Sequence, residues 1–381
     1  MSIIASQRHR FDIPDDIAFF NVAYYSPQLN ESTNRMLAAA RAKSHPWERT
    51  TDHFFDDADT IRTLASTIFG GDSDGWVVVP SATYGVTTAA RAVEPLMGPG
   101  DRILIAAEEF PANVFPWTRA AQETGASVVT VAHPEDGDWT RAIVGAIDKT
   151  VKIVATANCH WTNGAYIDLP TIGKACRDAG SILVVDATQS LGAMPLPMDE
   201  VRPDFLVAAG YKWLLSPYGF GLLYVAEQWR DARPLEESWQ ARSNAKQFAS
   251  LANYSDTYMP GARRFEVSEK CTALLPGTIA ALEQIGAWGV ENIADTLAAI
   301  NGRIGAHLER LGFELPSVAQ RCPHMLGAVM PPGQTGDLVT ALKQENIYIS
   351  QRGNALRFAP HLYINSNDER RLIEALDRLL A

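Results

Sequence analysis

The chain has 381 residues, of which 46% are hydrophobic and 20% charged, so it can bury the core of a large domain and a smaller one. The formal net charge of −11, without a cluster of lysine and arginine, argues against a nucleic-acid partner. No apolar stretch has the length of a membrane span and the first residues lack a signal peptide's apolar core, so we expect a cytoplasmic protein with no membrane partner. The four cysteines lack metal-ligand spacing, which indicates free thiols and no metal site.

The order of apolar and amphipathic segments predicts three parts. Residues 1–30 are expected to form an N-terminal arm with little regular structure. Residues 31–260 are interpreted as a large α/β domain, and residues 261–381 as a smaller C-terminal α+β domain. The runs that we interpret as strands of the large domain are Trp76–Pro80, Arg102–Ala106, Ser127–Val131, Val151–Ala155, Ile182–Val185, Phe205–Ala208 and Gly221–Val225.

The segment Ser81-Ala82-Thr83 follows the first of these strands and begins a predicted helix. The free backbone amides and the positive end of the helix dipole make such a junction an anion site. Ordinary capping of the helix by Ser or Thr is the alternative, and it is the commoner role of these residue types.

A carboxylate and an amine each stand where a predicted buried strand ends. Asp186 follows one strand and Lys212 follows the next, so parallel strands would bring both to the sheet edge where open α/β folds bind ligands. A single Asp here is usually a cap and a single Lys usually reaches solvent. Lys212, however, is flanked by apolar and aromatic residues, and a desolvated lysine is the reagent of Schiff-base chemistry.

Asp186-Ala187-Thr188-Gln189, followed by Tyr211-Lys212, resembles the core of the class V aminotransferase family. These are fold-type-I enzymes that use pyridoxal phosphate, and the resemblance extends from about Phe19 to Leu380. It implies a mostly parallel seven-stranded sheet flanked by helices. It also implies that Lys212 binds the cofactor as a Schiff base, that Asp186 pairs with its pyridinium nitrogen, and that Gln189 hydrogen-bonds its ring hydroxyl. The cofactor then acts as the electron sink.

Other segments match the family in part. The family places the cofactor phosphate at the turn that corresponds to Ser81, Ala82 and Thr83. Phe110 stands where desulfurases have a histidine that stacks on the cofactor ring, and an aromatic face can replace it. Tyr211 replaces another family histidine and is expected to bond the phosphate.

The segment Asn158–Gly164 resembles a "WNTG"-like variant found in C–S lyases. The resemblance leaves open which of His160, Thr162 and Asn163 reaches the cofactor. A histidine beside a cysteine is also compatible with metal binding, but no further ligands are spaced for it.

Two later segments imply substrate binding and assembly. Arg263–Ser268 resembles a family segment that reaches the partner's cofactor phosphate, so Ser268 is expected at that phosphate and the protein is expected to be a homodimer with active sites at the interface. Residues 351–363 resemble a segment whose second arginine binds the substrate carboxylate. Arg357 is that arginine and has the forked geometry for the task, while a surface ion pair is the alternative.

We therefore expect a pyridoxal phosphate enzyme acting on an α-amino acid, with transamination favoured. C–S elimination, kynureninase-like hydrolysis and epimerisation are alternatives. A persulfide-forming cysteine desulfurase is disfavoured, because residues 351–357 contain no cysteine and Cys322 lies well upstream. A nicotinamide-dependent oxidoreductase would need a glycine fingerprint after the first strand, which is lacking. A non-catalytic cofactor-binding protein would not need Lys212 and Arg357.

Overall fold

The central sheet is the largest unit of the fold. The computed structural model describes residues 3–333 and 336–380, and within them seven strands pair in the order β2-β8-β7-β6-β5-β3-β4. All neighbours are parallel except β8, which runs antiparallel to both β2 and β7. This confirms the predicted, mostly parallel sheet. The strands are β2 (Trp76–Val79), β3 (Arg102–Ala106), β4 (Ser127–Val131), β5 (Val151–Ala157), β6 (Ile182–Asp186), β7 (Phe205–Ala209) and β8 (Gly221–Val225).

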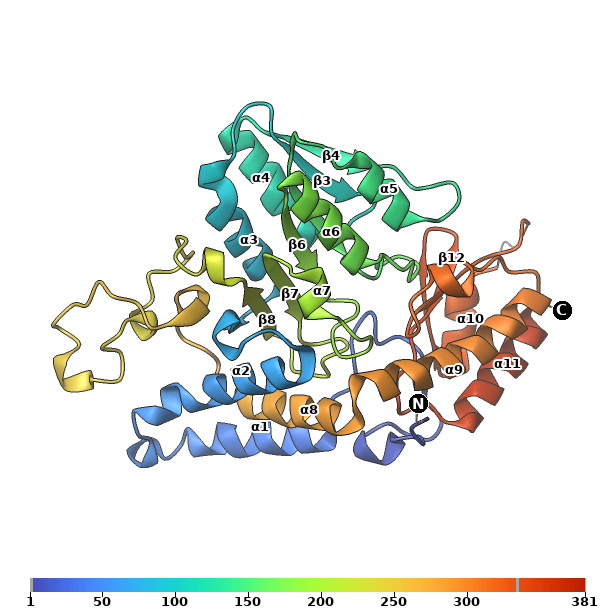
Figure 1. Ribbon diagram of the computed structural model, residues 1–381. Helices are drawn as coiled ribbons and strands as arrows, with labels where there is room; N and C mark the ends of the chain where they lie inside the picture. The colour runs from blue at the N-terminus through green and yellow to red at the C-terminus, as the bar shows by residue number, and fades with distance from the viewer. Residues whose placement is uncertain (1–2, 334–335, 381) are drawn as a thin grey trace.

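Helices cover both faces of this sheet (Figure 1). The strand side chains alternate between two apolar clusters, because each face of the sheet is buried. Helices α3 and α4 contribute to one cluster, and α5, α6 and α7 contribute to the other. The bounds are α3 (Ala82–Val93), α4 (Phe115–Thr124), α5 (Trp139–Ala146), α6 (Leu169–Ala179) and α7 (Met198–Val201).

Three helices from distant parts of the chain lie together beside the sheet (Figure 1). Helix α8 (Leu275–Trp288) packs against α1 (Asn30–Ala42) and α2 (Asp56–Phe69). Most of α8 is apolar and buried, which explains why it needs helices on more than one side. The segment between β8 and α8 is irregular with short 3-10 turns.

The C-terminal part is a small α+β unit. Its antiparallel sheet has the order β11-β12-β9 and lies beside three helices (Figure 1). The elements are α9 (Val290–Arg310), β9 (Leu326–Val329), α10 (Leu338–Gln344), β10 (Ile347–Tyr348), β11 (Ser350–Arg352), β12 (Ala355–Phe358) and α11 (Ser366–Leu380). The division of the chain at residues 30 and 260 stays a prediction.

The N-terminal arm is attached to this C-terminal unit. Strand β1 (Ala18–Phe19) pairs in parallel with β10, and Asn21 continues the pairing with Ala359. The arm then reaches the edge of the large sheet, where the Ser26 amide donates a 3.0 Å hydrogen bond to the Tyr211 carbonyl. In the described ranges, no helix is long and apolar enough to cross a bilayer.

Candidate active site

A pocket lies at the carboxyl ends of the parallel strands. The loops after β3, β5, β6 and β7 all contribute to it, as expected for ligand binding in an open α/β sheet. Four residues predicted from the sequence line this pocket together, namely Phe110, Asp186, Gln189 and Lys212. The lining residues are Glu109, Phe110, Ala157, Cys159, Trp161, Asp186, Thr188, Gln189 and Lys212.

Lys212 is the central amine of the pocket. Its side chain is buried, with 5% of the residue exposed, and its Nζ lies 5.3 Å from the centroid of the Phe110 ring. Burial lowers the pKa of Lys212 to about 8, although the charge of Asp186 opposes that shift. A lysine with this pKa has an appreciable unprotonated fraction near neutral pH, which a nucleophile or base requires.

Asp186 closes β6 and is buried in the pocket wall. Its Oδ1 accepts a 2.9 Å hydrogen bond from the Thr188 amide. Burial raises the pKa of Asp186, and the Thr188 hydrogen bonds and Lys212 partly offset this. Glu109 lies nearby, and burial together with the charge of Asp186 raises its pKa to about 8. A cation placed at Asp186 would therefore stabilise the negative charge of a carboxylate that the surrounding protein stabilises only in part.

Gln189 is fixed in place from both ends of its amide. Its Oε1 accepts a 3.0 Å hydrogen bond from Trp213 Nε1, and its Nε2 donates a 3.1 Å bond to the Ala23 carbonyl. The second N–H of the same amide remains a donor for a bound group. The arm residue Ala23 thus helps to orient a side chain of the pocket.

Arg357 lies on β12 beside this pocket, with 1% of the residue exposed. Its Nε donates a 3.1 Å hydrogen bond to Ser350 Oγ, and its Nη1 donates to the Trp161 carbonyl. Its Nη2 is buried and has no hydrogen-bond partner among residues 3–333 and 336–380. Burial lowers the pKa of Arg357 to about 9, and the charge of Arg352 adds to the effect. A carboxylate would supply the missing partner.

The residues predicted to bind a phosphate are not among those that line the pocket. Ser81 is the N-cap of α3 and its hydroxyl accepts a 3.1 Å hydrogen bond from the Tyr84 amide, so the capping role exists whether or not an anion binds. Ala82 and Thr83 form the first turn of α3. The Tyr211 ring centroid is 5.6 Å from Lys212 Nζ. The Ser268 amide donates a 2.9 Å bond to the Glu236 carboxylate.

The sequence of this chain is similar to those of known proteins over most of its length. A family model described as aminotransferase class-V matches residues 28–363. The chain belongs to the class-V aminotransferase family. An uncharacterized aminotransferase, YcbU of Bacillus subtilis (strain 168), is 24% identical over 373 residues, which cover 93% of this chain and 95% of that protein. Isopenicillin N epimerase of Amycolatopsis lactamdurans is 24% identical over 401 residues, 98% of each chain.

Solved structures of other proteins share the fold. An apo cysteine desulfurase from Thermococcus onnurineus NA1 has a TM-score of 0.84 at 17% identity, covering 100% of this chain and 99% of its own. A mutant of C-DES with glycine covalently linked to its PLP cofactor has a TM-score of 0.87 at 18% identity, covering 98% and 99%. Pyridoxal phosphate, which the sequence predicts, is the cofactor that this family membership indicates.

Two residues predicted to contact the cofactor, His160 and Thr162, lie beside the pocket and form a hydrogen bond with each other. His160 Nδ1 and Thr162 Oγ1 are 2.7 Å apart, and His160 Nε2 is 3.0 Å from the Ala107 carbonyl oxygen. The His160 ring also stacks on Trp139, with centroids 5.1 Å apart. The residues of this loop that line the pocket are Cys159 and Trp161. A cofactor contact from His160 or Thr162 stays a prediction.

Sequence reasoning did not identify Glu109, Cys159 and Thr188 as pocket residues. Glu109 had a usable signal, because it lies between the end of β3 and Phe110 in the same loop. Thr188 likewise lies between Asp186 and Gln189 in the motif that indicated the family. Cys159 also had a signal, because it directly precedes His160 in the segment expected to reach the cofactor, but its position beside Cys322 could not be read from the sequence.

Proposed function

We propose that this chain is a pyridoxal phosphate enzyme that acts on an α-amino acid, with transamination as its reaction. The observation that carries the proposal is Lys212, a buried amine with a pKa of about 8 that lies 5.3 Å from the centroid of the Phe110 ring, in a pocket that Asp186 also lines. The residues fit the cofactor, because a pyridinium ring offers Asp186 a cationic partner and offers Phe110 a flat face.

The bound cofactor supplies an electron sink for the electrons released at the substrate's α carbon. Lys212 holds the cofactor covalently at rest and, once freed, moves a proton from the α carbon. Asp186 holds a proton on the pyridine nitrogen by its negative charge. Gln189 bonds the ring hydroxyl through its free N–H, and the amides of Ala82 and Thr83 with the Tyr211 hydroxyl bind the phosphate.

Arg357 binds the substrate carboxylate through Nη2, its unpartnered nitrogen. The bonds to Ser350 and Trp161 fix the plane of the guanidinium, so little rotational freedom is lost when the substrate binds. The α carbon is thereby directed towards the amine of Lys212.

Transamination is favoured because it needs no group beyond a lysine that moves protons. A persulfide-forming desulfurase of the usual kind would need a thiol on a mobile loop before Arg357. Here β11 and β12 form a tight hairpin in which Arg352 pairs with Ala355, and the turn between them is Gly353-Asn354. This hairpin offers neither the thiol nor the loop.

C–S bond cleavage is the second candidate, because the thiol of Cys159 lines the pocket. Relatives of this chain also include a cysteine desulfurase of Serratia proteamaculans, 28% identical over 234 residues that cover 61% of this chain and 56% of that protein.

A single-turnover experiment separates the two reactions. The holoenzyme is mixed with a panel of amino acids without any keto-acid acceptor. Transamination converts the cofactor to pyridoxamine phosphate in a stoichiometric amount and releases a keto acid. If the panel yields only pyruvate with a thiol or persulfide, and the original absorbance returns after each turnover, the lyase replaces the aminotransferase.

We also propose that the enzyme is a homodimer in which Ser268 reaches the partner's cofactor phosphate. The support is the resemblance of Arg263–Ser268 to the family segment. Buried ion pairs of Glu266 with Arg62 and Lys270 hold this segment firmly against β2.

A further inference from the structure

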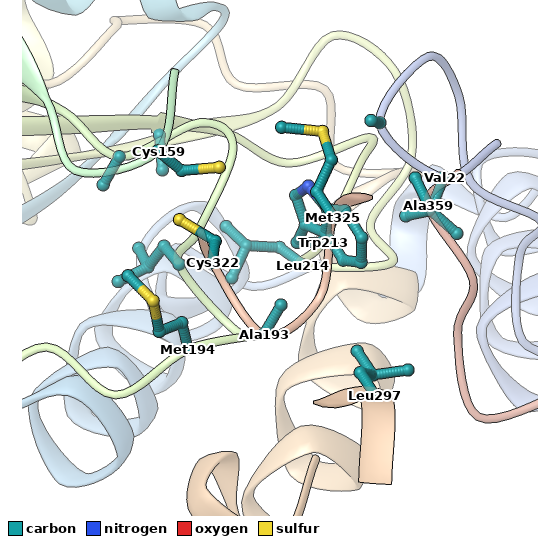
Figure 2. Close-up of a cluster of buried hydrophobic side chains, with 14 of the residues drawn as sticks. Val22, Cys159, Ala193, Met194, Trp213, Leu214, Leu297, Cys322, Met325 and Ala359 are labelled. Atoms are coloured by element: carbon teal, nitrogen blue, oxygen red, sulfur yellow. The ribbon is translucent and has the colours of Figure 1, made fainter. Parts of the chain in front are cut away.

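Two cysteines far apart in the sequence lie next to each other at the pocket wall. Cys159 follows β5 and lines the pocket with Lys212, and Cys322 precedes β9. Figure 2 shows their sulfur atoms on the facing sides of the two side chains. Both residues are buried, with 0% and 2% exposed, and neither is in a disulfide.

The backbone around the two cysteines holds them in a fixed register. Cys159 forms an antiparallel bridge with Tyr166, and the adjacent Ala165 forms one with Arg321. The Cys322 amide donates a 2.8 Å hydrogen bond to the Gly164 carbonyl. The backbones of both cysteines therefore lie next to the segment Gly164–Tyr166. Their closeness is fixed by the fold and does not depend on a mobile loop.

The surroundings favour a thiolate at Cys159. Burial raises the pKa of this thiol, but the neighbouring Cys322 and His324 side chains and the charge of Arg357 outweigh it and lower the pKa to about 6. Burial and the neighbouring Cys159 raise the pKa of Cys322 well above its usual value. The pair thus combines a reactive thiolate with a protonated thiol, which is the arrangement of an attacking and a resolving cysteine.

We propose that Cys159 and Cys322 form a reversible intramolecular disulfide when the enzyme meets hydrogen peroxide, an oxidant small enough to enter the pocket. The Cys159 thiolate attacks one peroxide oxygen, the O–O bond breaks, and hydroxide leaves to give a sulfenic acid. The Cys322 sulfur then attacks the Cys159 sulfur, and the S–O bond breaks. The hydroxyl group leaves with the Cys322 proton as one molecule of water. The two sulfurs together lose two electrons and peroxide gains them.

The cross-link would act on substrate binding through Trp161. Cys322 Sγ already donates a hydrogen bond of 3.6 Å to the Asn158 carbonyl, in the loop whose Trp161 carbonyl accepts from Arg357. A disulfide would join the loop after β5 covalently to the segment before β9. It would shift the Trp161 carbonyl, so we expect turnover to fall as the disulfide forms.

The test is peptide mapping of the holoenzyme after treatment with hydrogen peroxide, without reduction. This readout does not depend on which reaction the enzyme catalyses, so it stands even if the proposed transamination fails. We expect a cross-linked peptide pair containing Cys159 and Cys322, the loss of these two thiols among the four of the chain, and full return of both with dithiothreitol.

Two of the other cysteines give matched controls. Cys271 is exposed, and burial raises the pKa of Cys176 to about 12. The variants Cys271→Ser and Cys176→Ser should form the same cross-link. In Cys322→Ser the resolving thiol is absent, so we expect Cys159 to be oxidised further to sulfinic acid, which dithiothreitol does not reduce. Recovery of Cys159 and Cys322 as free thiols under conditions that oxidise Cys271 would overturn the proposal, and this outcome needs no variant to fold.

Discussion

Arg357 of β12 donates a hydrogen bond from Nη1 to the backbone carbonyl of Trp161, in the loop after β5. This bond joins the C-terminal sheet to the edge of the large sheet. It fixes a buried guanidinium beside Lys212 and leaves Nη2 without a partner in the part of the chain that the structure describes. The two units therefore meet at the point where we expect the substrate to bind.

Replacement of Arg357 by lysine should lower kcat/KM for amino acids while keeping the positive charge. The ammonium cannot bond Trp161, Ser350 and a carboxylate together, so we expect a loss of about 1.5–3 kcal/mol, or roughly 10- to 150-fold in kcat/KM. Steady-state kinetics measure it. An amine lacking the carboxylate is the control, and an equal loss with that amine would show that Arg357 acts only on the fold.

Replacement of Lys212 by alanine should abolish covalent binding of the cofactor. We expect a loss of about 10²- to 10⁴-fold or more in turnover, because the proton-transfer group goes with it. Borohydride reduction followed by mass spectrometry locates the linkage. Lys174→Ala, which removes an exposed lysine paired with Asp178, is the matched control. A reducible linkage that persists in Lys212→Ala would refute the assignment.

The reactivity of Lys212 should titrate at an unusually low pH. In the apoenzyme, the amine is protonated and unreactive below its pKa of about 8, and it becomes nucleophilic as the pH rises through that value. Competitive labelling with acetic anhydride, read peptide by peptide, should give this midpoint for Lys212 and higher midpoints for exposed lysines. Because Asp186 stabilises the protonated amine, Asp186→Asn should lower the midpoint further. A midpoint near that of exposed lysines would contradict the prediction.

Replacement of Asp186 by alanine should slow cleavage of the α C–H bond and weaken cofactor binding. Without the carboxylate, the pyridine nitrogen loses its proton and the electron sink becomes weaker, so we expect a loss of about 10²- to 10³-fold in kcat. Exchange of the α proton for deuterium, followed by NMR, isolates this step. Exchange within a few-fold of the parent enzyme would mean that Asp186 has only a structural role.

Dilution should reduce activity if Ser268 completes the partner's site. Light scattering should then show a dimer, and activity should fall in parallel with dissociation. Ser255, a half-buried serine that bonds Ser243 in the segment between β8 and α8, gives a control variant, Ser255→Ala, which should not change the dilution curve. A monomer that stays fully active when dilute would count against the interface site.

The sequence predicted the sheet well because its strands are short, largely apolar runs separated by polar or helical segments. Arg102–Ala106 begins and ends as predicted, and β5 runs on to Ala157. Lys212 and Asp186 could be placed together because parallel strands end at one edge. The neighbours Cys159 and Cys322 could not be paired this way, since only the packing of the C-terminal unit brings them together. His160 shows the same limit, because its bond to Thr162 and its stacking on Trp139 depend on local loop geometry.

The pairing of β1 with β10 links the beginning of the chain to its end, and this has a consequence for biosynthesis. Ala18 and Phe19 leave the ribosome before the large sheet is made, but their partners Ile347 and Tyr348 are made after all of its strands. The large sheet can form during translation, because all of its strands lie before residue 226. The arm that carries Ala23 to Gln189 must wait until β10 has been made, so the pocket is completed only well after the last strand of the large sheet has been synthesised.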